Sequence, residues 1–127
     1  MGDAYVLGYI MGMTYIQGTV LGPQGEEPVT LLVDSGAKYS LLPERVWRKI
    51  GLTEGRAQQF SLADGSIITR PVSECEISLP QGRCHTPVVL GDPQDPEALL
   101  GVVTLEELGL VFDPFRRVLD RIRVLQI

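Results

Sequence analysis

The chain has 127 residues, of which 44% are hydrophobic and 21% are charged, and its net charge is −5. This length fits one domain, and the composition is that of an ordinary globular protein, which argues against long disorder. The acidic balance argues against nucleic-acid binding, because such domains usually carry a basic face. We therefore expect a single domain over residues 1–127, and the 14 glycines and 9 prolines favour short strands and turns.

The first segment, residues 4–25, carries no charged residue. Its length would suit a membrane span, but glycine, threonine, glutamine and proline interrupt it, and no positive region precedes it as in a secretory signal. Its β-type composition and the turn at Gly22-Pro23-Gln24-Gly25 predict two uncharged strands. We therefore expect no membrane partner and a cytoplasmic location.

The following elements are indicated by local patterns of apolar, turn and capping residues. A buried strand over Pro28–Val33 runs into Asp34-Ser35-Gly36-Ala37, and Pro43–Gly51 forms a short helix whose apolar face holds Val46, Trp47 and Ile50. Farther along the chain we expect a hairpin over Phe60–Ile68 with Asp64-Gly65 at its turn, strands at Val72–Leu79 and His85–Leu90, and a helix from Leu99 to about Leu108. After this helix we expect a turn at Asp113-Pro114, flanked by Val111-Phe112 and Val118-Leu119, and a last strand over Ile122–Ile127. Thr104 and Glu107 match a capping box, which leaves a later start of the second helix open.

The two cysteines and the single histidine limit the possible site chemistry. Pairing about a turn near Gln81 places Cys84 opposite Ser78 and Cys75 opposite Pro87, so we expect no disulfide. One histidine gives no zinc constellation, and we expect His85 to be a partly exposed strand residue rather than a catalytic base. No metal site is predicted.

The segment that carries chemistry is Leu31-Leu32-Val33-Asp34-Ser35-Gly36-Ala37. A carboxylate at the end of a buried strand is costly unless it is paired, hydrogen-bonded or functional. Gly36 allows the backbone to approach the carboxylate and offer its N–H, and the Ser35 hydroxyl can support the loop. The plainer alternative is an ordinary Asx-turn.

With these residues the chain resembles the retroviral-type, or retropepsin-like, aspartic proteases, and among them the bacterial and archaeal single-domain members. Val33-Asp34-Ser35-Gly36-Ala37 fits the family's catalytic motif, and Leu99-Leu100-Gly101 fits its second element, two apolar residues and a glycine before a helix. Ala63-Asp64-Gly65 lies where the family has the tip of its hairpin flap. Lys38 departs from the viral pattern, which usually has an acidic residue there that contacts the substrate backbone.

The resemblance implies an all-β, retropepsin-like acid protease lobe with one or two short helices. It implies an aspartic endopeptidase without metal or organic cofactor, in which Asp34 is catalytic and Ser35, Gly36 and Ala37 support its loop. Because one chain holds one Asp-Ser-Gly, it further implies a homodimer in which Asp34 of each chain acts on one water and one peptide or unfolded protein substrate. Ala63, Asp64 and Gly65 would form the flap.

Two alternatives remain open from the residues alone. The chain could be a non-catalytic dimerisation or peptide-binding module on the same fold, because a fold does not establish an activity. The hairpin at Asp64-Gly65 could be a plain surface turn rather than a moving flap.

Overall fold

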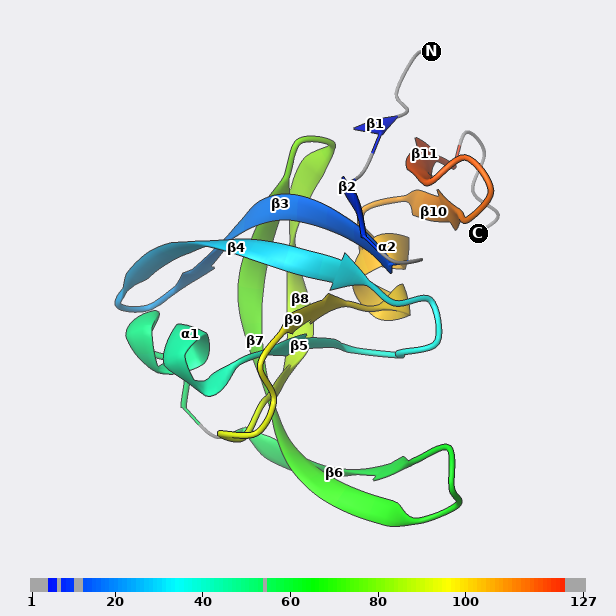
Figure 1. The fold of residues 1–127 in the computed structure, drawn as a ribbon. Coiled ribbons are helices and arrows are strands. Elements are labelled where there is room, and N and C mark those ends of the chain that lie inside the picture. The colour runs from blue at the N-terminus through cyan, green and yellow to red at the C-terminus, as the bar shows by residue number, and fades with distance from the viewer. Residues whose placement is uncertain (1–4, 7, 11–12, 54, 123–127) are drawn as a thin grey trace.

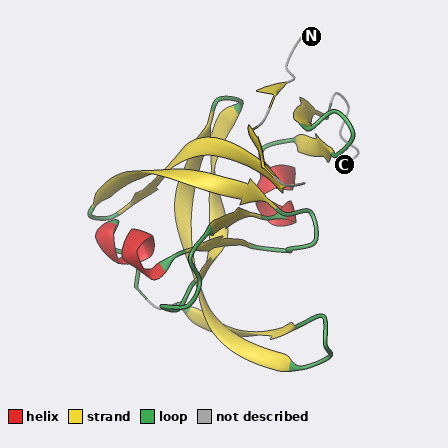
Figure 2. Cartoon of the chain, viewed as in Figure 1, coloured by secondary structure: helices red, strands yellow, loops and turns green. Residues whose placement is uncertain are grey.

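The computed structural model describes residues 5–6, 8–10, 13–53 and 55–122, and the side chains from residue 13 onward (Figure 1). Strands dominate, and two short helices accompany them (Figure 2). The larger sheet has the order β2-β3-β4-β9-β5-β8-β7-β6, and a small sheet has the order β1-β11-β10. The strands are β1 (Tyr5–Val6), β2 (Gly8–Ile10), β3 (Met13–Gly22), β4 (Gly25–Val33), β5 (Ser40–Leu42), β6 (Arg56–Ser61), β7 (Ile67–Leu79), β8 (Gly82–Leu90), β9 (Ala98–Leu100), β10 (Leu110–Asp113) and β11 (Val118–Arg121), and the helices are α1 (Glu44–Lys49) and α2 (Val102–Glu107). The predicted all-β fold with short helices is confirmed.

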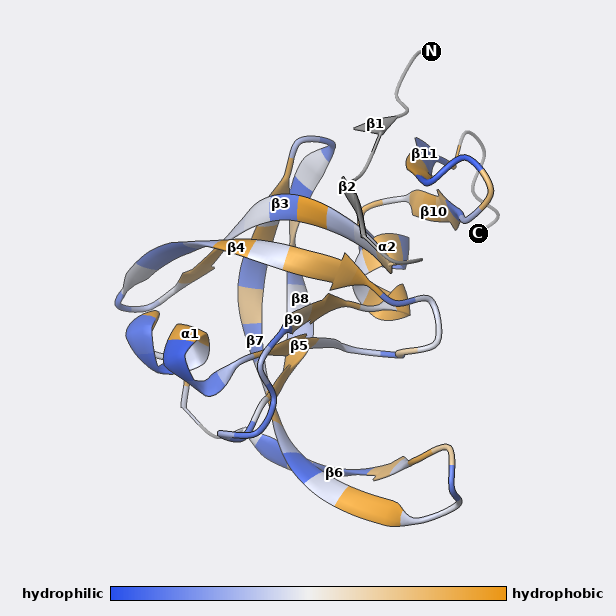
Figure 3. Ribbon diagram, viewed as in Figure 1, coloured by the Kyte–Doolittle hydropathy of each residue, from blue (hydrophilic) through white to orange (hydrophobic). Residues whose placement is uncertain are grey.

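An additional pairing of β3 with β7 closes the larger sheet into a ring of β3, β4, β9, β5, β8 and β7. The ring encloses the core, because alternate residues of its strands are buried, as at Leu31 and Val33 of β4. Hydrophobic residues, coloured orange, make up the end of β4 and much of α2 (Figure 3). The predicted first helix is present as α1, which buries Val46, and the chain leaves it through Gly51 at a φ of +81° that favours glycine.

The N-terminal segment differs from the prediction, since its described residues up to Gly22 form three strands, whereas two were expected. The strand β1 pairs with β11 near the other end of the chain, whereas β2 and β3 form an antiparallel hairpin in the larger sheet. The segment therefore serves two sheets, which its local composition could not reveal. The predicted last strand lies mostly outside the described residues, because β11 ends at Arg121 and residues 123–127 are not described.

The second helix does not begin at Leu99, and the later start that the sequence left open is confirmed. Leu99 and Leu100 belong to strand β9, which pairs with β4 in parallel and with Leu41 in an antiparallel bridge. The helix begins at Val102 after Gly101, and the capping box is not used, since Thr104 lies inside the helix with its side chain buried. A short apolar run is compatible with a helix or a strand, and the strands packed beside it decide which of the two it forms.

The predicted register around the cysteines is wrong by one residue on the partner strand. The turn consists of Pro80 and Gln81, with Leu79 opposite Gly82, so Cys75 faces Thr86 and Cys84 faces Ile77. The conclusion drawn from that register is confirmed, because both cysteines are free. His85 is an exposed residue of β8, as predicted.

No helix of the described residues has the length and apolar character needed to cross a bilayer.

Candidate active site

The predicted catalytic carboxylate lies directly after β4, on the loop that leads to β5. The backbone N–H of Asp34 donates to the Leu100 carbonyl at 3.0 Å, and the Ala37 N–H returns to the Asp34 carbonyl at 3.1 Å. The Gly36 N–H donates to Oδ1 of Asp34 at 2.9 Å, as the motif led us to expect. The carboxyl group is half-buried, and within the described chain its Oδ2 has no hydrogen-bond partner. One oxygen is therefore held in place while the other remains available.

The rest of this loop is joined to the start of α2. The carbonyls of Ala37 and Lys38 accept hydrogen bonds from the N–H groups of Val102 and Val103, both at 2.9 Å. Ser35 is exposed, and its hydroxyl makes no hydrogen bond within the described part of the chain. The support expected of Ser35 is thus not given within one protomer, and the backbone of α2 supplies it instead.

A buried group of three hydroxyls beneath the loop was missed by the sequence analysis. The Oγ of Ser40 accepts the Gly101 N–H at 3.0 Å and lies 2.6 Å from Oγ1 of Thr104, which lies 2.9 Å from Oγ1 of Thr86. Each hydroxyl comes from a different element: β5, α2 and β8. The signal was a lone hydroxyl in each of three apolar segments, but nothing in the sequence indicated that they meet.

Gly101 permits the close approach on which this arrangement depends. A Cβ atom placed on it would lie 2.5 Å from the carbonyl carbon and oxygen of Tyr39. This distance is too short for any side chain, so the glycine of the Leu99-Leu100-Gly101 element lets the backbone of Tyr39 pass directly against the residue before α2.

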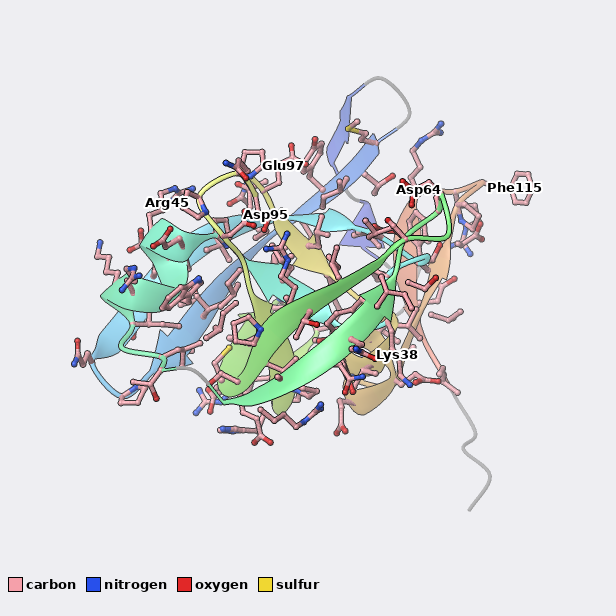
Figure 4. The ribbon with its side chains drawn as sticks, turned by 90° about the horizontal axis from the view of Figure 1, so that it is seen from below. Lys38, Arg45, Asp64, Asp95, Glu97 and Phe115 are labelled. Atoms are coloured by element: carbon pink, nitrogen blue, oxygen red, sulfur yellow. The ribbon has the colours of Figure 1, made fainter. Side chains whose placement is uncertain are left out.

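The predicted hairpin joins β6 to β7 through a three-residue loop, Ala63-Asp64-Gly65, rather than a two-residue turn. The Gly65 N–H donates to the Leu62 carbonyl at 2.9 Å, the Leu62 N–H donates to the Ser66 carbonyl at 2.8 Å, and Gly65 has a φ of +86°. This is a type I turn followed by a left-handed residue. Oδ1 of Asp64 accepts the Ser66 hydroxyl and N–H, and these bonds lower the pKa of Asp64. Asp64 therefore shapes the tip (Figure 4).

A groove of about 560 Å³ lies between the catalytic loop and this hairpin. The loop contributes Gly36, Ala37, Lys38 and Tyr39, and the hairpin contributes Phe60, Ser61 and Leu62 from β6 and the turn, with Ile68 and Arg70 from β7. Asp34 is next to the lining residues, whereas the tip residues 63–65 lie beyond it. Of the predicted site residues, Gly36 and Ala37 therefore line the groove, and Ala63, Asp64 and Gly65 do not.

Among the described residues, no group of three or more His, Cys, Asp or Glu side chains is arranged to hold a metal ion.

Comparison with solved structures places this arrangement in a known fold. The crystal structure of a retropepsin-like aspartic protease from Rickettsia conorii superposes with a TM-score of 0.63 at 15% sequence identity, over 91% of this chain and 87% of that one. The fold is therefore the retropepsin-like one. A comparison with curated proteins gave no match.

Residues 16–104 match the family model described as "Aspartyl protease", and this match covers most of the chain, including the Asp34 loop, the hairpin and Leu99-Leu100-Gly101. The chain belongs to the aspartyl protease family, and its enzyme class is that of the aspartic endopeptidases. The resemblance identified from the motifs is confirmed.

Proposed function

We propose that this protein hydrolyses peptide bonds as a homodimer, with Asp34 of each protomer at one shared site. The observation that carries the proposal is the Asp34 carboxylate, which one tight loop presents beside a groove with its Oδ2 unpartnered within the described chain. The carboxylate among the lining residues of this groove, Asp95, accepts the Asp92 N–H at 2.9 Å in the loop after β8. One protomer therefore offers half of a two-carboxylate site.

The chemistry follows from placing two such carboxylates together. Close carboxylates do not both ionise readily, so the pair holds one proton between them. The ionised group takes a proton from the attacking water, and the protonated group donates to the scissile peptide as the bond breaks. The Gly36 N–H on Oδ1 keeps each carboxylate in a fixed orientation through both steps.

The shape of the protomer supports a shared site. The β4–β5 loop, the tip of the β6–β7 hairpin and the small β1-β11-β10 sheet all project on the right-hand side of Figure 1. On this side the Ser35 hydroxyl is exposed and has no partner within the described part of the chain, and Phe115, in the turn after β10, is 92% exposed. A two-fold axis on this side would bring the two Asp34 loops together and cover these groups.

The hairpin is proposed as the flap, with Ala63, Asp64 and Gly65 at its tip. Two apolar side chains flank this tip in the open, Leu62 at 43% and Ile67 at 65% exposure, where the hairpin is coloured as hydrophobic (Figure 3). Apolar groups on a projecting hairpin are suited to covering a bound peptide and excluding water.

We also propose that residues 1–127 form one domain and that the protein is cytoplasmic. Pairing of β1 with β11 joins the two ends of the described chain and supports one domain over residues 1–127. The free cysteines accord with a cytoplasmic location, where thiols stay reduced. The intact Asp34 loop and the membership in a protease family favour an enzyme over a non-catalytic binding module.

The test mixes wild-type chains with an equal amount of Asp34→Asn chains and lets the subunits exchange. Asn is close to Asp in shape but is not a base, so we expect Asp34→Asn to fold like the wild type, as judged by circular dichroism, and to be inactive. Random pairing makes about a quarter of the dimers wild-type, so activity should fall to about half of that given by the same wild-type chains alone. Undiminished activity after mixing, or turnover by folded Asp34→Asn alone, would refute the proposal.

A further inference from the structure

The groove contains three charged side chains, and two of them are already engaged. Arg70 forms an ion pair with Asp92, and Asp95 accepts the Asp92 N–H, so both belong to one network in the loop after β8. Lys38 is exposed and forms no ion pair within the described residues. Of the two cations that line the groove, Lys38 is therefore the one without an ion-pair partner among the described residues, and it lies on the catalytic loop.

The backbone and the aromatic neighbours of Lys38 hold it at the junction of this loop with β6. Its carbonyl accepts the Val103 N–H, and its Nζ lies 6.0 Å from the centre of the Tyr39 ring. That ring meets Phe60 of β6 edge to face at 6.0 Å, and its hydroxyl accepts a hydrogen bond from Arg56 at 3.2 Å. Figure 4 labels Lys38, which comes from the β4–β5 loop.

We propose that Lys38 makes this groove select peptides that carry an acidic side chain close to the scissile bond. The inference rests on the proposed function and adds the substrate class. Lys38 follows Asp34 by four residues, and both Ala37 and Lys38 line the groove, so an extended peptide that reaches the carboxylate passes the ammonium group. A glutamate side chain there gains Lys38 as a cationic partner, since Arg70, the other cation of the groove, is already paired with Asp92, whereas a lysine side chain is repelled.

The experiment compares peptides that differ only by Glu or Gln at each position flanking the cleaved bond. For the wild type at pH 5.5 we expect the Glu peptide to have the higher kcat/KM at one or more positions, by about two- to fivefold, the range of a partly exposed ion pair. Below about pH 4 the substrate glutamate is protonated, and the ratio should approach one. Added salt should also reduce it.

The variants separate Lys38 from a general effect of charge. Lys38→Met should bring the Glu-to-Gln ratio to about one, Lys38→Glu should invert it, and Lys38→Arg should keep it. The matched control is Lys49→Met, because Lys49 is the other lysine of the chain and pairs with Glu27 from α1, away from the groove. The control should keep the wild-type ratio.

Binding to Asp34→Asn separates failure of this inference from failure of the proposed function. The folded variant should bind the Glu peptide more tightly than the Gln peptide by the same factor, measured by fluorescence anisotropy, whether or not the wild type cleaves either. Equal or reversed preference in the wild type, or a preference that survives in Lys38→Met, would overturn the inference. Cleavage without preference would leave the proposed function standing.

Discussion

The three buried hydroxyls beneath the catalytic loop contribute to the stability of the fold, and Thr104→Val tests how much. Thr104 is fully buried, and its Oγ1 lies 2.6 Å from Oγ of Ser40 and 2.9 Å from Oγ1 of Thr86. Valine has nearly the same volume, so the change removes hydrogen bonds while leaving the packing almost intact. Two buried hydroxyls lose a partner, although Ser40 keeps the Gly101 N–H.

The magnitude follows from these two losses. Each net hydrogen bond contributes about 1 kcal/mol, and a buried polar group left without its partner costs about 1–3 kcal/mol. We therefore expect Thr104→Val to lower the free energy of unfolding by about 2–4 kcal/mol. For a domain of this size, about 4 °C of Tm per kcal/mol is typical, so Tm should fall by roughly 8–16 °C.

Thermal unfolding followed by circular dichroism measures the change, with all proteins at the same concentration because a dimer's Tm depends on it. The control is Thr69→Val, an exposed threonine of β7, which should change the free energy by at most about 0.5 kcal/mol. If Thr104→Val were as stable as the control, the hydrogen bonds among the three hydroxyls would not stabilise the loop, and the expected loss of free energy would be refuted.

Three further predictions concern the flap, the thiols and pH. Gly65→Val should lower kcat/KM with little change in Tm, because a β-branched residue resists the φ of +86° at this exposed tip. The control Gly65→Asn should retain activity, because Asn tolerates a positive φ. Equal kcat/KM in both variants would make the hairpin purely structural. Burial raises the pKa of Cys75 to about 12 and that of Cys84 to about 11, so both thiols should react slowly with iodoacetamide at pH 8 until the protein is unfolded; rapid labelling of the folded protein would contradict this. Activity should be highest on the acid side of neutral, because raising the pH removes the proton that the two carboxylates share; a pH–rate profile still rising through pH 8 would exclude that mechanism.

The comparison of sequence with structure is clearest at Asp34 and at the hairpin. The apolar run before Asp34 and the glycine after it are local signals, and they predicted the strand, the tight loop and the Gly36 hydrogen bond that the structure contains. At Asp64-Gly65 the sequence predicted the hairpin and the positive φ of Gly65. It did not predict the loop length, since two- and three-residue loops both accept these residues.

Leu99 and Leu100 illustrate what local patterns leave open. Two leucines before a glycine suit a helix as well as a strand, and the partners that decide, Leu32, Val33 and Leu41, are more than fifty residues away. The pairing of β1 is likewise set by a distant segment, because β1 pairs with β11 near the other end of the chain.

Alone, the sequence determined that the chain forms short strands and turns, that Asp34 stands at the end of a buried strand, and that Gly51 and Gly65 occupy turn positions, because these properties depend on a few neighbouring residues. Only the tertiary structure decided that Ser40, Thr86 and Thr104 meet beneath the loop, and that Tyr39 contacts Phe60 beside the groove that Lys38 lines. These contacts depend on strand register and on ring closure through β3 and β7, which are set when the whole core packs at once.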